Sequence, residues 1–268
     1  MQNFFFMLAP IEGVTNSAFR SLCHRYGADL TMTPMARIDG LVRKNSVTCR
    51  RAEIKDETPT IIQLIGTKEE YFKRYLDSFV PTPGFRGFNL NLGCTSPQFI
   101  KLGLGGAMIK RVSKVKRIVD VIKDSGHRVS VKMRLGLNSF EKEKKTYLNL
   151  IEGVDAGLFI VHARHGGQTY KDPADFSVYA QCVATGRDII ANGDISTWTQ
   201  IESLMGAGVK GAMIGRAAVA NPAIFNRLKG KPELPSADLL AQYRQLAASF
   251  GETCPANLDV SKGPMESG

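Results

Sequence analysis

Residues 87–136 read GFNLNLGCTSPQFIKLGLGGAMIKRVSKVKRIVDVIKDSGHRVSVKMRLG, and this stretch predicts a strand, a helix and a second strand. Polar and apolar residues alternate over 87–93, as in a strand, whereas 112–126 is amphipathic over a longer run. The same succession of short β-rich runs and longer amphipathic runs recurs along the chain. Strands that alternate with helices pair in parallel through crossovers, so the stretch predicts an α/β fold.

Eight such units are present. The predicted helices include 16–27, 68–79, 112–126, 141–154 and 197–208, and several end in glycine, which favours the position after a helix. Eight units and 268 residues favour one (β/α)8 TIM barrel of roughly 250 residues over a doubly wound open sheet, the alternative. The predicted strands are 4–10, 28–33, 60–66, 87–93, 128–136, 158–164, 188–195 and 210–217.

The chain divides into a barrel over 1–230 and a short C-terminal extension over 231–268. A connector at 229–235 leads to one predicted helix at 236–250, followed by a tail with Gly and Pro that we expect to be flexible. No apolar run approaches the ~18 residues of a membrane span, and the apolar start 4–10 reads as a first strand rather than a secretion signal.

The five cysteines, at 23, 49, 94, 182 and 254, are scattered and form no CxxC pair. Neither a structural zinc site nor a disulfide framework is therefore expected, and no metal is predicted. A reducing cytoplasm is the compartment that this cysteine usage favours.

Positive charge is concentrated in one segment. Residues 101–145 hold thirteen Lys and Arg against four Asp and Glu, which accounts for +9 of the net charge of +10. Such a segment can bind phosphates through counterion release, or it can simply be a solvated helix face. Charge alone leaves both interpretations open.

Polar residues end most of the predicted strands, where a TIM barrel carries its chemistry. Because polar side chains are costly to bury without partners, their convergence favours a ligand site. Glycines after the seventh and eighth strands, followed by the predicted short helix in AAVANPAIF, suggest a phosphate site. The strand-end residues are Ala9, Pro10, Gln63, Asn91, Cys94, Lys132, Arg134, His162, Arg164, Asn192, Gly193, Asp194, Gly215 and Arg216.

Lys132, on the fifth strand, permits three interpretations. A lysine near the barrel axis can be a Schiff-base nucleophile, can stabilise negative charge on a reduced flavin, or can extend its amine to solvent at the rim.

Eight motifs in order resemble the dihydrouridine synthases, FMN-dependent enzymes that reduce uridine in transfer RNA. They include APIEGVTNSAFR (9–20), NLGCTSPQ (91–98), VKMRLG (131–136) and VHARHGGQTYKDPADF (161–176). The others are QLIG (63–66), GLGGAMIKR (103–111), IANGDI (190–195) and IGRAAVANPAIF (214–225), so the resemblance spans about residues 5–228.

The resemblance implies a role for each matching residue. Cys94 matches the catalytic cysteine that protonates C5 of the uracil while C6 receives a hydride, and a thiol of pKa ~8.5 carries the required proton at neutral pH. It also implies FMN, a visiting NADPH or NADH, and a tRNA substrate. The matching cofactor residues are Ala9, Pro10, Gln63, Lys132, His162, Asn192, Gly193, Asp194, Gly215 and Arg216, and the substrate residues are Asn91, Arg134, Arg164, Gln168 and Tyr170.

The chain departs from the family pattern at Thr95, where proline is usual, at Ala163-Arg164-His165, and in its shortened C-terminal helical region. Tyr170 either packs near the uridine or anchors its own loop. Two other functions stay open: an FMN barrel like dihydroorotate dehydrogenase, acting on a free pyrimidine, and a non-catalytic RNA-binding barrel.

Overall fold

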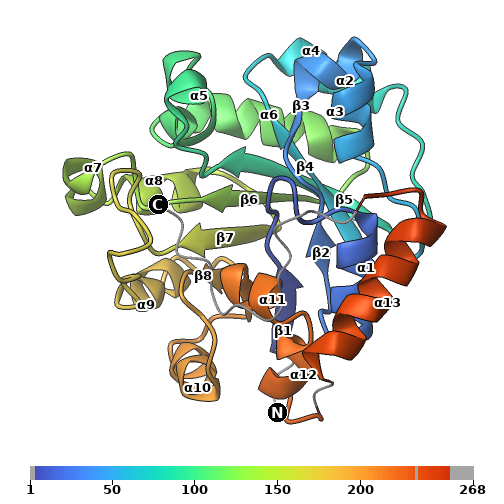
Figure 1. Ribbon diagram of the computed structural model, residues 1–268. Coiled ribbons are helices and arrows are strands. Elements are labelled where there is room, and N and C mark those ends of the chain that lie inside the picture. The colour runs from blue at the N-terminus through green and yellow to red at the C-terminus, as the bar shows by residue number, and fades with distance from the viewer. Residues whose placement is uncertain (1–3, 233–234, 254–268) are drawn as a thin grey trace.

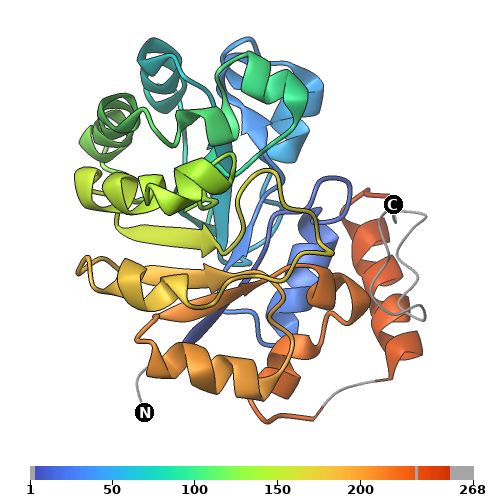
Figure 2. The ribbon, with the colours of Figure 1, turned by 90° about the vertical axis from the view of Figure 1, so that its left-hand side faces the viewer.

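The computed structural model describes residues 4–232 and 235–253, and its strands form a parallel barrel with helices around the outside (Figures 1 and 2). Hydrogen-bonded neighbours follow the order β1-β9-β8-β7-β6-β5-β4-β2. The strands are β1 (Phe5–Leu8), β2 (Thr31–Met32), β4 (Thr60–Ile65), β5 (Phe85–Leu92), β6 (Val129–Met133), β7 (Leu158–His162), β8 (Ile189–Asn192) and β9 (Gly211–Ile214), with β3 (Ala36–Arg37) paired to β4.

The barrel closes between its first two strands. A parallel bridge joins Met7 of β1 to Leu30 beside β2, and β1 also pairs in parallel with β9. The predicted (β/α)8 barrel is therefore confirmed, and the alternative of an open doubly wound sheet is wrong. All eight predicted strands are present. Each is shorter than predicted at one or both ends, and β5 in addition begins two residues earlier.

Helices follow the strands along the chain. They are α1 (Ser17–Arg25), α2 (Ile38–Val42), α3 (Ser46–Arg51), α4 (Glu69–Leu76), α5 (Pro97–Lys101), the 3₁₀ helix η1 (Gly105–Met108), α6 (Val112–Asp124), α7 (Ser139–Glu143), α8 (Thr146–Gly153), α9 (Val178–Val183), α10 (Trp198–Gly206), α11 (Arg216–Ala220), α12 (Ile224–Leu228) and α13 (Ser236–Ser249). No helix in the described ranges is long and apolar enough to span a membrane.

One predicted helix is wrong in extent. The segment 141–154 was expected to be continuous, but α7 ends at Glu143 and α8 begins at Thr146. Lys145 lies between them with a φ of 53°, a left-handed conformation that interrupts the helical path.

Two apolar clusters make up the core. The smaller cluster lies inside the barrel, with Met7, Met32, Ile160, Ile190 and Met213 among its members. The larger one lies between the outer faces of the strands and the surrounding helices. Polar residues follow toward the carboxyl ends of the strands, where His162 and Asn192 lie two positions after Ile160 and Ile190.

Helix α13 packs against α1 (Figure 1). The Tyr243 ring meets the Phe19 ring edge-on at a centroid distance of 5.7 Å, and its hydroxyl donates to Asn16 Oδ1 at 3.2 Å. Tyr26 donates to Gln242 at 2.9 Å. The predicted C-terminal helix is thus present, and most of the predicted flexible tail, 254–268, lies outside the described residues.

Candidate active site at the carboxyl ends of the strands

A polar wall lines one side of the barrel interior, on β4, β5 and β6. Gln63 Nε2 donates to Asn89 Oδ1 at 2.9 Å, and Asn89 Nδ2 donates to Ser130 Oγ at 2.9 Å. Asn91 and Lys132 follow two residues later on their strands, so they extend the same wall toward the barrel mouth. Sequence reasoning missed Asn89 and Ser130, although the two-residue alternation places them on the same strand faces as Asn91 and Lys132.

Asn91 fixes the start of the loop that carries Cys94. Its Oδ1 accepts from the backbone N–H groups of Gly93 at 3.1 Å and Cys94 at 3.0 Å. Its Nδ2 donates to Gln63 Oε1 at 2.9 Å. Asn91 therefore connects the buried wall to the cysteine. Gln63 orients Asn91, because its Nε2 is held by Asn89 and its Oε1 accepts from Asn91.

The glycine-rich loop packs directly on Cys94 from the other side. Gly106 N donates to Cys94 O at 2.8 Å. Gly105 has a φ of +57°, and a Cβ there would lie 2.6 Å from Cys94 O. Only glycine fits this left-handed position at such close approach. Asn91 and the glycine-rich loop thus hold the Cys94 backbone from two sides, while the residue itself stays partly exposed.

Lys132 is the unpaired cation of the polar wall. Its amine forms no hydrogen bond or ion pair with any residue in the described ranges, and it is only partly exposed. Burial is the main cause that lowers its pKa to about 8, the nearby Arg134 acts in the same direction, and Cys94 opposes the shift. An amine without a protein partner at the barrel mouth is available to a ligand.

His162 ends β7 and is neutral. Burial lowers its pKa to about 2, and the positive charges of Lys132, Arg134, Arg164 and Arg216 act in the same direction. Its Nε2 lies 3.2 Å from Arg164 Nη1, which is always a donor, so Nε2 accepts and we assign the ring proton to Nδ1. The ring therefore keeps one N–H donor for a ligand.

The Arg164 side chain is buried, which gives no support to the RNA contact that the resemblance implies for it. Its side chain is 1% exposed. Its donors are used within the protein, by Asp172 O at 2.7 Å, by His162 and by the carboxylate of Asp194. A buried guanidinium with these partners positions His162 and Asp194 instead.

Asp194 lies in the turn after β8 and connects it to three other residues. It has a φ of +52° and follows Gly193, whose φ is +121°. Its Oδ1 pairs with Arg216 at 2.5 Å, and its other oxygen pairs with Arg164 and accepts from Ala174 N. A Cβ at Gly193 would lie 3.1 Å from His162 Cδ2, so the glycine lets the turn approach the histidine.

Tyr170 covers the Arg216 side chain. The guanidinium carbon lies 4.1 Å from the centroid of the Tyr170 ring, a cation–π contact, and the tyrosine is 52% exposed. The prediction left two roles for Tyr170, and this contact gives its loop an attachment to the β9 end. The exposed part of the ring is still accessible to a ligand.

The other predicted residues lie at the same end of the barrel. Asn192 Nδ2 donates to Met213 O at 2.9 Å, and a Cβ on Gly215 would lie 3.5 Å from that of Ala9, which precedes Pro10. Arg134 and Gln168 both bond to the backbone of His165, at 3.0 and 2.9 Å. His165 therefore organises this loop.

The basic segment 101–145 is only partly neutralised. Lys110, Arg117, Lys123 and Lys142 form ion pairs, with Glu141, Glu69, Asp155 and Asp175 respectively. Lys101, Arg111 and Lys144 are exposed on or beside α5, α6 and α7. Because α5 and α7 follow β5 and β6 in the chain, part of this charge lies near the barrel mouth.

The fold and site are those of a TIM-barrel enzyme with its polar groups at the strand ends. The chain belongs to the dihydrouridine synthase family: the family described as "Dihydrouridine synthase (Dus)" matches residues 7–255. A probable tRNA-dihydrouridine synthase of Aquifex aeolicus is 30% identical over 237 residues, covering 85% of this chain and 73% of the relative. One from Staphylococcus epidermidis is 31% identical, with 90% and 76% covered.

Solved structures support the fold. TcOYE is similar with a TM-score of 0.56 at 11% identity, covering 91% of this chain and 93% of that one. The old yellow enzyme homologue from Zymomonas mobilis has a TM-score of 0.55 at 10% identity, with 96% and 94% covered. At these identities the likeness concerns the barrel alone.

Proposed function

We propose that this chain reduces a uridine of transfer RNA to 5,6-dihydrouridine, with FMN as cofactor and Cys94 as the proton donor. The observation that carries the proposal is the attachment of Cys94 to Asn91, which fixes the cysteine at the mouth of a barrel whose wall holds Lys132. Membership of the dihydrouridine synthase family supports the reaction.

The residues at the mouth fit FMN. Lys132 offers an amine that has no partner in the described residues, and an amine suits the electron-rich ring of a reduced flavin. The Arg216 guanidinium, near the turn at Gly193, suits a phosphate. When bound and reduced, FMN supplies the hydride that C6 of the uracil accepts.

The proton on C5 comes from the chain itself. The Cys94 thiol donates its proton to C5, leaves a thiolate, and regains a proton from solvent. Asn91 and the backbone of Gly106 bond to the backbone of Cys94, which limits the positions that the thiol can reach. Lys132 and Arg134, both cationic and near Cys94, stabilise the thiolate.

His162 contributes a neutral hydrogen-bond donor. Its pKa, lowered to about 2, keeps the ring uncharged at neutral pH. Its Nδ1–H then orients an acceptor atom of the cofactor without competing for the reaction's proton. Arg164 holds this tautomer through Nε2.

The RNA contacts rest on the basic surface near the mouth. A uridine must leave its stack to reach the site, which costs a few kcal/mol. Phosphate contacts from exposed cations such as Lys101, Arg111 and Lys144 offset that cost. We further propose NADPH, or NADH, as the visiting reductant and the cytoplasm as the compartment, which the free cysteines favour.

Purified protein, loaded with FMN and supplied with NADPH, tests the proposal. Dihydrouridine should appear in unmodified tRNA, detected as an added pair of hydrogens by mass spectrometry of nucleosides. Turnover of dihydroorotate without any product in tRNA would favour the free-pyrimidine enzyme. Binding of tRNA by a protein that takes up no flavin would favour the non-catalytic barrel.

A further inference from the structure

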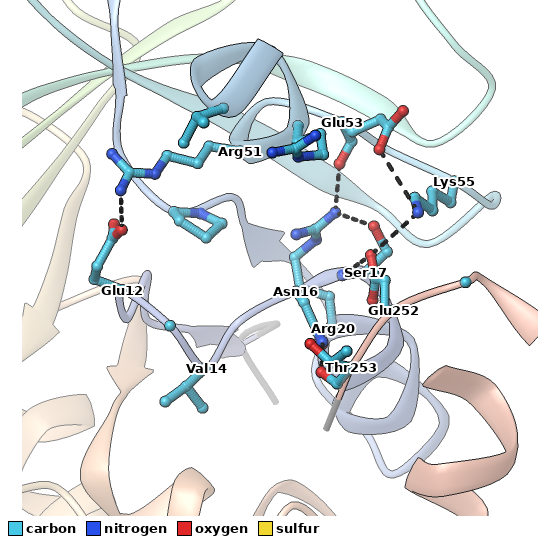
Figure 3. A pocket seen from close by; sticks show the side chains of 15 residues that line it. Glu12, Val14, Asn16, Ser17, Arg20, Arg51, Glu53, Lys55, Glu252 and Thr253 are labelled. Carbon is cyan, nitrogen blue, oxygen red and sulfur yellow. Dashed lines mark hydrogen bonds and ion pairs between the residues drawn. The ribbon is translucent and has the colours of Figure 1, made fainter. Parts of the chain in front are cut away.

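A charged cavity lies beside the loop that follows β1. It has a volume of about 630 Å3 and lies between residues 12–17, helix α3 and residues 251–253 (Figure 3). Among the residues that the structure describes, four cations line it, namely Arg20, Arg50, Arg51 and Lys55. The loop leaves the carboxyl end of β1, so this cavity opens at the same end of the barrel as Cys94.

An anionic side chain from the end of the chain occupies the start of α1. Glu252 Oε1 accepts from Ser17 N at 3.2 Å, and its Oε2 accepts from Ala18 N at 3.0 Å. Helix α1 has no acidic residue in its own first turn. A carboxylate 235 residues away in sequence from Ser17 therefore fills a position that favours a negative charge.

Arg20 gives independent evidence that the cavity favours an anion. It is 2% exposed and lines the cavity, yet its Nε has no hydrogen-bond partner in the described part of the chain. Its other nitrogens donate to Thr15 O, Ser17 Oγ and Glu53 O. A buried cation with an unsatisfied donor is costly, and an anion nearby reduces that cost.

Two of these cations have carboxylate partners in the cavity lining. Lys55 lies 3.7 Å from Glu53 and 3.7 Å from Glu252, and Arg51 pairs with Glu12, which is 58% exposed. Arg50 forms no ion pair within the described ranges. The Arg51–Glu12 pair is exposed, so it contributes little to stability and a phosphate can compete for Arg51.

We propose that this cavity binds a backbone phosphate of the RNA substrate, and that Glu252 occupies the place of that phosphate until RNA displaces it. The inference rests on the proposed function, because it names a contact of the same substrate. Two adjacent arginines on α3 and one lysine suit an extended phosphate chain, to which each contributes one contact. Glu252 then acts as an internal competitor for RNA.

Binding of fluorescently labelled tRNA to the full chain tests this, by anisotropy over a range of salt concentrations. Glu252→Gln should tighten binding about two- to fivefold, the size of a charge interaction at a helix end. Glu202→Gln, an exposed residue on α10, removes the same charge elsewhere and controls for the general field. Arg50→Gln should weaken binding of tRNA and lower the slope of log K against log salt concentration by about 0.7 to 0.9. Arg86→Gln is the control, because Arg86 lies at the amino end of β5, and it should change both quantities less.

Inorganic phosphate is titrated in parallel by calorimetry. The inference is overturned if Glu252→Gln binds tRNA no better than Glu202→Gln, or if Arg50→Gln leaves the salt slope of the wild type. It is overturned in its RNA part if only inorganic phosphate binds more tightly to Glu252→Gln. Dihydrouridine formation by the wild type is measured separately, so loss of this inference leaves the proposed function standing.

Discussion

Lys132→Met gives a prediction that combines stability and binding. The substitution keeps the length of the side chain and removes the charge that the fold holds at the barrel mouth. In the wild type the pKa of this amine falls from 10.5 to about 8 because burial disfavours its charged form. The unfolded chain therefore binds the proton more tightly than the folded chain, so protonation favours unfolding.

The magnitude follows from the shift. At about 1.36 kcal/mol per pKa unit, the charged lysine costs the fold at most about 3 kcal/mol below pH 8. Lys132→Met should raise the free energy of unfolding of the cofactor-free protein by up to that amount at neutral pH. The free-energy cost of the charged lysine is fully present below the folded pKa and disappears as pH rises through 10.5. The stability gain of Lys132→Met over the wild type should therefore fall by about 2 kcal/mol between about pH 7 and about pH 9.5.

Urea unfolding of both proteins at the two pH values measures the effect. Lys116→Met, on the exposed face of α6, is the matched control and should change stability little at either pH. The same Lys132→Met protein should lose about ten- to a hundredfold in FMN affinity, the size of a hydrogen bond to a charged group. Two results would contradict this prediction. One is a Lys132→Met protein that is no more stable than Lys116→Met at neutral pH, and the other is a stability gain that does not change with pH.

Three further predictions concern the groups around the cysteine. Asn91→Ala removes two hydrogen bonds to backbone N–H groups, each of about 1 kcal/mol. The rate of dihydrouridine formation in single-turnover assays should therefore fall about tenfold to a hundredfold while flavin content is kept, and an unchanged rate would contradict this. Asp194→Asn leaves the buried Arg164 poorly paired and should destabilise the fold by about 3 kcal/mol in urea. Asp155→Asn, which breaks two exposed ion pairs, should destabilise it much less, and equal effects would count against the network. His162 should give no proton NMR titration between about pH 5 and about pH 8, because its pKa is lowered to about 2; a ring that titrates near its usual pKa would disprove the neutral assignment.

The barrel itself was predictable because its signal is local. Alternation in the strands and the glycines that end several helices indicate a parallel barrel without any knowledge of contacts, and Gly27, Gly126 and Gly208 do have left-handed φ values. The break between α7 and α8 was not predictable in this way. It depends on Lys145, a residue type that carries no turn signal of its own.

The sequence predicted which residues lie at the site better than it predicted what each of them contacts. A polar residue at a strand end indicates a ligand site, but the sequence does not reveal its partner. Arg164 shows the difference, because its burial depends on Asp194, thirty positions later, and on the backbone of Asp172 in the loop after β7. The cavity at Glu252 depends on contacts between opposite ends of the chain, which no local pattern encodes.

The most direct test of the central claim is single-turnover reduction of unmodified tRNA by the FMN-loaded protein, reduced beforehand, with either cysteine or alanine at position 94. We expect Cys94→Ala to keep its flavin and bind tRNA but to form dihydrouridine at least about a hundredfold more slowly, since proton delivery is lost. Formation of dihydrouridine at the wild-type rate by Cys94→Ala would contradict it.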